Sequence, residues 1–217
     1  MIAGQRWNGR LLCVAFGWLI IVCDVYAESL RRIVQETQGS APENLTASSE
    51  FLYFTADDGI HGRELWRLGT DGHVELVRDL VPGPASSSPS ILAAGPDSLL
   101  FESTIGGASP LRLWCLDQTG SVRIANPEVL GLQPHRAIWS NGRYFVLATT
   151  AAHGLELWTV NPVNAAIDLP RDIWAGPGSG PVSGDVELAR LNGKVLFSAT
   201  SPMMDAAALW HSDGTEA

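Results

Sequence analysis

The chain has 217 residues and a formal net charge of −9, with 46% apolar and 17% charged residues. This composition is sufficient for a hydrophobic core and excludes a disordered chain or a coiled coil. Binding to nucleic-acid phosphates requires clustered Lys and Arg, which the sequence lacks, so we expect no nucleic-acid partner.

Residues 1–27 have the pattern of a secretory signal peptide. Arg6 and Arg10 precede the apolar run LLCVAFGWLIIVC (11–23), and VYA (25–27) predicts cleavage after Ala27. The apolar run is short for a bilayer span, so we predict no stable membrane span after cleavage. The expected location is secreted or at the cell surface, in the periplasm or outside the cell. A lipoprotein attached through Cys23 is the alternative.

Cleavage would remove two arginines, one aspartate and two cysteines, leaving a net charge of −10 and Cys115 alone. We therefore expect no internal disulfide, and no Cys/His cluster has metal-binding spacing. Residues 28–42 are polar and are expected to form a linker.

Residues 43–217 repeat a unit of about 48 residues. The dipeptide Leu-Trp occurs four times, and a strand-like run precedes each copy: FLYFTA (51–56), LLFEST (99–104), YFVLAT (144–149) and VLFSAT (195–200). The tryptophans are Trp66, Trp114, Trp158 and Trp210. We align the runs at Phe54, Phe101, Leu147 and Phe197. Nine residues before each aligned position stands Leu45, Leu92, Ile138 or Leu188.

Each unit is predicted to contain four strands. The first carries the Leu or Ile position and turns into the aromatic run, with Asn141-Gly142 and Asn192-Gly193 as strong hairpin signals. A Gly-rich loop leads to the Leu-Trp strand, and a turn leads to a fourth strand such as HVELVRDL (73–80). We therefore predict an all-β, β-propeller-like array of four-stranded blades. Three full units and a partial fourth would form an incomplete arc.

The segments GRELWRLGTDG (62–72) and ALWHSDGTEA (208–217) resemble the bacterial ELWxxDGT repeat, also called hyalin-like. The copies LRLWCLDQTG (111–120) and LELWTVNPVN (155–164) depart from the motif. The resemblance implies a secreted or surface-associated β-propeller with no established enzyme activity. The family motif continues beyond the position of Thr215, so our hypothesis is that the chain is a fragment of a longer protein.

The four tryptophans could form a ligand platform, but a bulky aromatic in every unit is better explained by packing between blades. Glu64 and Glu156 precede Leu-Trp, whereas Arg112 and Ala208 occupy that place in the other copies. We therefore expect these glutamates to be solvent-facing strand residues, with no catalytic or metal-binding role.

Asp57-Asp58-Gly59 and Asp71-Gly72 offer oxygen ligands for Ca²⁺, but turn geometry explains them better, and calcium in the first unit remains the alternative. His61 and His153 share one repeat position, which indicates a loop preference. Cys115 could be a reactive thiol, but a small residue that is buried or half-buried is the better interpretation. The triplet 44–46 is a glycosylation sequon by pattern only.

The predicted function is non-enzymatic binding or scaffolding at the cell surface or in an extracellular matrix, with extracellular proteins or glycans as partners. We assign no catalytic residue, cofactor-binding residue or metal ligand. One alternative is the scaffold portion of a secreted propeller enzyme whose catalytic residues lie outside this chain. Another is a non-functional relic.

Overall fold

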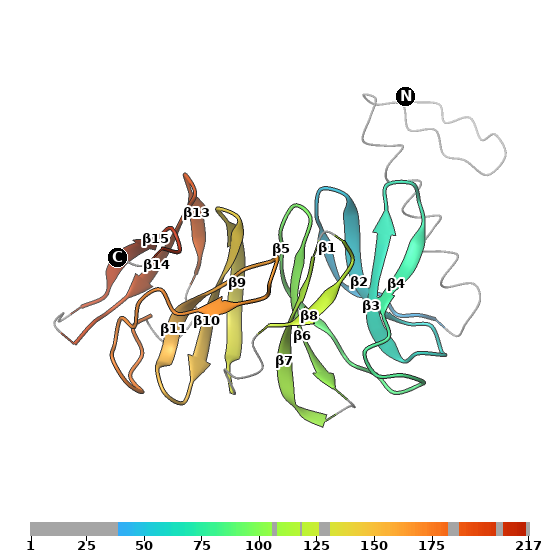
Figure 1. Ribbon diagram of the computed structural model, residues 1–217, viewed down its shortest axis with the longest axis horizontal. Helices are drawn as coiled ribbons and strands as arrows, with labels where there is room; N and C mark the ends of the chain where they lie inside the picture. The colour runs from blue at the N-terminus through green and yellow to red at the C-terminus, as the bar shows by residue number, and fades with distance from the viewer. Residues whose placement is uncertain are drawn as a thin grey trace, which may run out of the picture.

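The computed structural model describes residues 39–105, 108–117, 119–125, 131–181, 187–202 and 206–215. These residues form fifteen strands in four antiparallel sheets (Figure 1). The described ranges contain no helix, and therefore none that could cross a membrane. The expected signal peptide and residues 28–38 of the expected linker lie outside them. The remaining linker residues are attached to the first sheet, because the Asp57 amide donates to the Ser40 carbonyl at 2.9 Å.

The sheets follow chain order, and we call them blades 1 to 4. Blade 1 contains β1 (Glu43–Ala47), β2 (Phe51–Asp57), β3 (Arg63–Gly69) and β4 (Val74–Arg78). Blade 2 contains β5 (Ser90–Ala94), β6 (Leu99–Ile105), β7 (Ala108–Leu116) and β8 (Val122–Ile124). Blade 3 contains β9 (Gln133–Ser140), β10 (Arg143–Thr150), β11 (Gly154–Val160) and β12 (Ile167–Asp168). Blade 4 has three strands: β13 (Ala189–Leu191), β14 (Lys194–Ala199) and β15 (Ala208–Ser212).

The predicted hairpins are confirmed. Asn141 and Gly142 have φ of 49° and 77°, and Asn192 and Gly193 have φ of 50° and 75°. Two successive positive φ angles define the turn that matches the twist of antiparallel strands. Of the Leu/Ile positions, the first three lie in β1, β5 and β9, and Leu188 lies just before β13.

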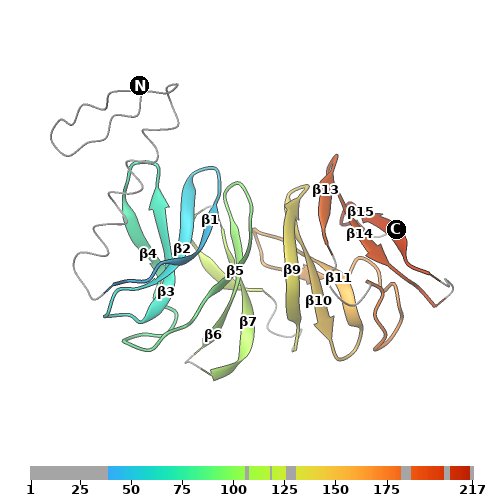
Figure 2. The ribbon, with the colours of Figure 1, turned by 180° about the vertical axis from the view of Figure 1, so that it is seen from behind.

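The blades stack face to face, and three apolar clusters join them in order (Figures 1 and 2). Each blade presents the leucine of Leu-Trp to the blade that follows, which contributes its tryptophan. Trp114, Trp158 and Trp210 pack between blades in this way, which confirms the packing interpretation for them. Trp66 packs on Phe54 and Leu68 of its own blade.

The alignment of the third unit was wrong by one residue. In the other blades the aligned phenylalanine lies opposite the tryptophan, as in Phe54 and Trp66, but Trp158 lies opposite Val146. Leu147 lies opposite Leu157 and faces blade 4. The strand β10 is buried on both faces, so it lacks the apolar–polar alternation that sets register in a half-exposed strand.

The last blade leaves its leucine uncovered. Leu65, Leu113 and Leu157 are 1%, 7% and 4% exposed, whereas Leu209 is 75% exposed. We expect Leu157→Ala to lower the free energy of unfolding by about 2–5 kcal/mol and Leu209→Ala to change it by less than about 0.5 kcal/mol. Urea unfolding of both variants checks this. Equal losses would mean that Leu209 is covered in solution.

Candidate functional site

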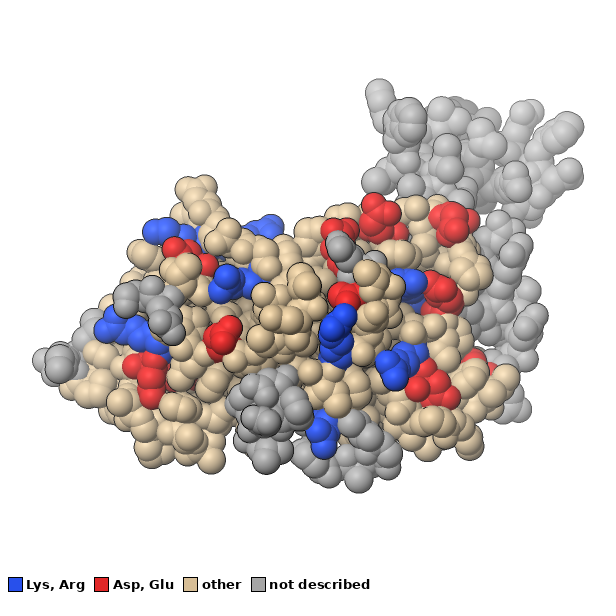
Figure 3. Space-filling model, in the orientation of Figure 1, with Lys and Arg blue, Asp and Glu red and all other residues tan. Residues whose placement is uncertain are grey.

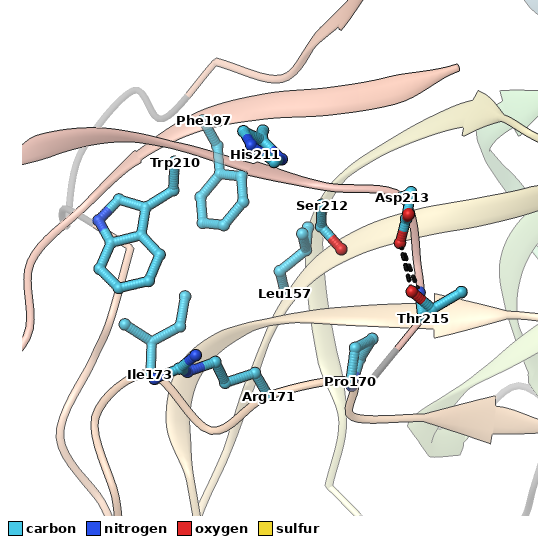
Figure 4. Close-up of a pocket in the computed structure, with 10 residues that line it drawn as sticks. All are labelled: Leu157, Pro170, Arg171, Ile173, Phe197, Trp210, His211, Ser212, Asp213 and Thr215. Atoms are coloured by element: carbon cyan, nitrogen blue, oxygen red, sulfur yellow. Dashed lines mark hydrogen bonds between the residues drawn. The ribbon is translucent and has the colours of Figure 1, made fainter. Parts of the chain in front are cut away.

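A pocket of about 360 Å³ lies between blades 3 and 4, beside β15 (Figure 4). Its apolar walls come from both blades: Leu157 and Ile173 from blade 3 and the loop after it, and Phe197 and Trp210 from blade 4. Arg171 and Ser212 add polar groups. Asp213 also lines the pocket, so the pocket offers an apolar surface beside one cation and one carboxylate, which suits an amphipathic group.

The indole of Trp210 is held in place by its own hairpin. Its Nε1 donates to the Ala199 carbonyl at 3.0 Å, and in blade 1 the Trp66 Nε1 donates to the Ala56 carbonyl at 3.2 Å. The side chains of Trp210 and Phe197 project from β15 and β14 toward the loop that carries Ile173 (Figure 4). The wall of the pocket is thus set by strand pairing.

Asp213 at the end of β15 closes a tight turn. Its Oδ1 accepts the amide and hydroxyl hydrogens of Thr215 at 3.0 and 2.6 Å, and the hydroxyl bond lowers the pKa of Asp213. Asp71, five places after Trp66, accepts the His73 amide at 2.9 Å in a bond of the same kind. The interpretation of Asp71 as a turn residue is confirmed.

The two middle blades keep this turn chemistry at positions that the motif comparison missed. Asp117 Oδ1 accepts the amide and hydroxyl hydrogens of Thr119, and Asn161 Oδ1 accepts the Val163 amide at 2.8 Å. Both residues stand three places after the tryptophan, where an Asp or Asn could have been found by counting from Leu-Trp.

The expectation for Glu64 and Glu156 was wrong, because both side chains are fully buried. Glu64 accepts the Ser87 amide at 2.9 Å, the Ser87 hydroxyl at 2.5 Å and the Leu80 amide at 3.4 Å. Glu156 accepts the amides of Ile173, Trp174 and Gly180 at 3.2, 3.0 and 3.0 Å. Each glutamate holds the loop that follows the fourth strand of its blade, and we call this arrangement a glutamate clasp.

The two held loops share a sequence pattern. DLVPGPAS (79–86) and DIWAGPGS (172–179) both read Asp-x-x-x-Gly-Pro-x-Ser. The final serine of each accepts a backbone amide of the Leu-Trp strand: Ser86 Oγ from Arg63 at 2.9 Å and Ser179 Oγ from Leu155 at 3.1 Å. This paired pattern was the signal in the sequence that could have located the clasps.

The clasp in blade 3 predicts a pH dependence of stability. Burial raises the pKa of Glu156 to about 7, although three amides donate to its carboxylate. Between about pH 4.5 and 7 the folded state then holds one more proton than the unfolded state, so stability falls as pH rises through this range. The expected loss is up to ~3 kcal/mol. Glu156→Gln should flatten this part of the profile.

Urea unfolding at pH 5 and pH 7.5 measures the effect in both proteins. Burial also raises the pKa of Glu64, so this residue adds a further decrease of stability with rising pH. The Glu156→Gln variant keeps that contribution. Identical slopes in the two proteins would contradict the prediction.

The two histidines pair with aspartates of the loops, in agreement with the loop preference that their shared repeat position indicated. His61 Nδ1 lies 2.7 Å from Asp58 Oδ2, and this hydrogen bond raises the pKa of His61. His153 Nδ1 lies 2.8 Å from Asp172 Oδ2. Asp57 and Asp58 accept loop amides. The described residues contain no group of three or more His, Cys, Asp or Glu placed to hold a metal ion.

Cys115 is buried, as expected, and burial raises the pKa of its thiol to about 12. In the sequon, the Asn44 amide donates to Thr55 Oγ1 at 3.4 Å. Basic residues lie interspersed with acidic residues on the face shown in Figure 3, with no block of positive charge there. One of the pairs on the chain is Arg67 with Glu75 at 2.6 Å.

No family model and no curated protein matches the chain. Among solved structures, it is similar to a protein assigned as TolB from Agrobacterium tumefaciens, at 13% identity and a TM-score of 0.47, over 80% of this chain and 63% of that one. A puromycin hydrolase matches at 14% identity and a TM-score of 0.43, over 75% of this chain and 27% of that one. A protein assigned as a gluconolactonase matches at 19% identity and a TM-score of 0.43, over 76% of this chain and 58% of that one. The chain spans less than two thirds of each.

Proposed function

We propose that the chain is a secreted, non-enzymatic repeat protein of the ELWxxDGT type that binds or scaffolds extracellular proteins or glycans. The observation that carries this proposal is that the glutamate and histidine side chains of the repeat are engaged in holding its loops. Glu64 and Glu156 hold loops, and His61 and His153 pair with loop aspartates. In the described part of the chain, the apolar pocket between blades 3 and 4 is a surface open to a partner.

The location rests on the signal-peptide pattern of residues 1–27. The stacked blades suit a binding role because they form a rigid support whose loops and edges can carry a binding surface without local rearrangement. The proposed partners are proteins with extended apolar segments or glycans with apolar ring faces.

Expression of the full chain with a C-terminal tag in a bacterial host tests the proposal. The expected product begins at Glu28, lies outside the cytoplasm and is retained on immobilised matrix proteins or glycans. Ala27→Arg is the matched control and should block processing. An unprocessed chain in the cytoplasm would overturn the location. Turnover of a hydrolase or lyase substrate by the purified product would overturn the non-enzymatic role.

A further inference from the structure

A second pocket, of about 300 Å³, lies between blades 2 and 3. The hairpin turns at 95–98, 117–121 and 161–166 all contribute to its lining. The lining combines apolar and charged side chains, among them Trp139, Val163, Asp97, Asp117 and Arg123. Its volume is at the lower end of the range for small-ligand sites, ~300–1,000 Å³. The second pocket is therefore large enough for one small ring-shaped group.

Trp139 in this pocket is not one of the four tryptophans of the repeat. It pairs with Tyr144 in the first hairpin of blade 3. The residues at the same place in the other blades are small or charged: Ala47, Ala94 and Arg190. Packing shared by all blades would require a similar side chain in each, as it does for the Leu-Trp tryptophans. An aromatic that occurs in one blade, is partly buried and lines a pocket indicates a function of that place.

The indole of Trp139 is fixed in the wall of the pocket. It lies edge-to-face with the Tyr144 ring, with 4.9 Å between the ring centroids. It also lies against Gly95, where a Cβ atom would come within 2.9 Å of the indole ring. The Tyr144 hydroxyl accepts the Gly95 amide at 3.1 Å and bonds to Ser98 Oγ at 2.6 Å. The indole is therefore positioned before a ligand arrives, which lowers the entropy cost of binding.

The carboxylate of Asp97 is not needed by its own turn. Asp71 and Asp117 each accept a backbone amide of the turn in which they lie. The turn at 95–98 is instead closed by a backbone hydrogen bond of 2.9 Å between its first and last residues. The Asp97 side chain is exposed, and it accepts no hydrogen bond from any residue in the part of the chain that the structure describes. Its carboxylate is therefore available to a ligand in the pocket.

Charges of both signs line the pocket, and they decide the class of ligand. Arg123 Nη2 lies 3.4 Å from Asp117 Oδ2, and the Arg123 side chain is 52% exposed. A hydroxyl group donates to a carboxylate and accepts from a guanidinium, so a ring with several hydroxyls satisfies both Asp97 and Arg123. A cationic ligand would meet Arg123, an anionic ligand would meet Asp97, and an apolar ligand would leave both without water. The lining therefore favours an uncharged ring with hydroxyl groups.

We propose that the second pocket binds one uncharged pyranose ring of a glycan. The apolar C–H face of the ring packs on Trp139. Its hydroxyl groups donate to Asp97 and accept from Arg123. The bound ring also covers Val163, a pocket residue that the fold leaves 71% exposed. This deepens the proposed binding function, on which it rests, by naming the class of glycan and the place where it binds.

Calorimetric titration of the purified chain with cellohexaose, maltohexaose and laminarihexaose tests the inference. Saturable binding of at least one of these uncharged sugars at millimolar concentration is expected. Trp139→Ala should weaken binding about tenfold or more, whereas Trp139→Phe keeps an aromatic ring and should weaken it less than about threefold. Asp97→Asn should weaken binding about tenfold, because hydrogen bonds to a charged acceptor are lost. Asp71→Asn, in a turn outside the pocket, is the matched control and should leave binding unchanged.

Urea unfolding confirms that each variant still folds. Absence of saturable binding to all three sugars would overturn the inference, as would equal binding by Trp139→Ala and the parent chain. Tighter binding of a protonated chitosan hexamer would assign the pocket to a cation and overturn the choice of an uncharged ring. Export and retention on matrix proteins are scored separately. A chain that is exported and retained but binds none of these sugars would keep the proposed function and lose this inference.

Discussion

Gly154→Ala is expected to lower the free energy of unfolding by more than about 4 kcal/mol. Gly154 has a φ of 61°, which disfavours any side chain. In addition, a Cβ atom there would overlap the Gly178 carbonyl and lie 2.7 Å from the Pro177 carbonyl oxygen. These atoms belong to the backbone of the loop that Glu156 holds, so the clash cannot be relieved by a side-chain rotation. Urea unfolding gives the size of the loss.

Gly142→Ala is the matched control, because Gly142 has a φ of 77° and open space where the Cβ would lie. Its expected cost is about 1 kcal/mol, from backbone conformation alone. The difference between the two losses of unfolding free energy is the part caused by the close approach of the loop at 172–179 to Gly154. Should Gly154→Ala cost no more than Gly142→Ala, the loop would not lie against Gly154 in solution.

Glu64→Ala should cost about 3 kcal/mol, because it leaves buried donors without an acceptor. Three hydrogen bonds are lost, from the Ser87 amide, the Ser87 hydroxyl and the Leu80 amide. The Ser87 amide should also exchange its hydrogen faster, since the loop is released locally. Urea unfolding measures the first effect, and hydrogen exchange followed by NMR measures the second.

The control for Glu64 is Glu102→Ala. The Glu102 side chain is half-buried on β6, and its carboxylate accepts no hydrogen bond from any residue within the described ranges. Burial raises the pKa of Glu102. Its removal should change stability by less than about 1 kcal/mol. Similar losses of unfolding free energy in Glu64→Ala and Glu102→Ala would mean that the three hydrogen bonds of Glu64 contribute little beyond the packing of its side chain.

The arrangement of strands was accessible from the sequence because its determinants are local. Hairpin turns at Asn141 and Asn192, and a Leu-Trp strand in each unit, required only residue type and spacing. The burial of Glu64 could not be predicted from residue type and spacing. Strand alternation says which residues share a face, but the cover over Glu64 comes from a loop that begins after the next strand. Only the matching loops at 79–86 and 172–179 indicate it.

The pocket could not be predicted from the sequence either. Its walls come from residues far apart in the chain, such as Leu157 and Trp210, which only the stacking of blades 3 and 4 brings together. The alignment error at Leu147 has a related cause. Where both faces of a strand are apolar, the sequence does not distinguish one register from the next, and only the cross-strand partners decide.

The buried thiol of Cys115 makes the middle of the array observable. Its Sγ lies 3.4 Å from the Pro162 carbonyl oxygen of blade 3, and its pKa of about 12 leaves almost no thiolate at neutral pH. Alkylating reagents react with the thiolate, so they modify Cys115 only when blades 2 and 3 separate. The labelling rate therefore measures how often blades 2 and 3 separate. It does not change when only the blades at the two ends open.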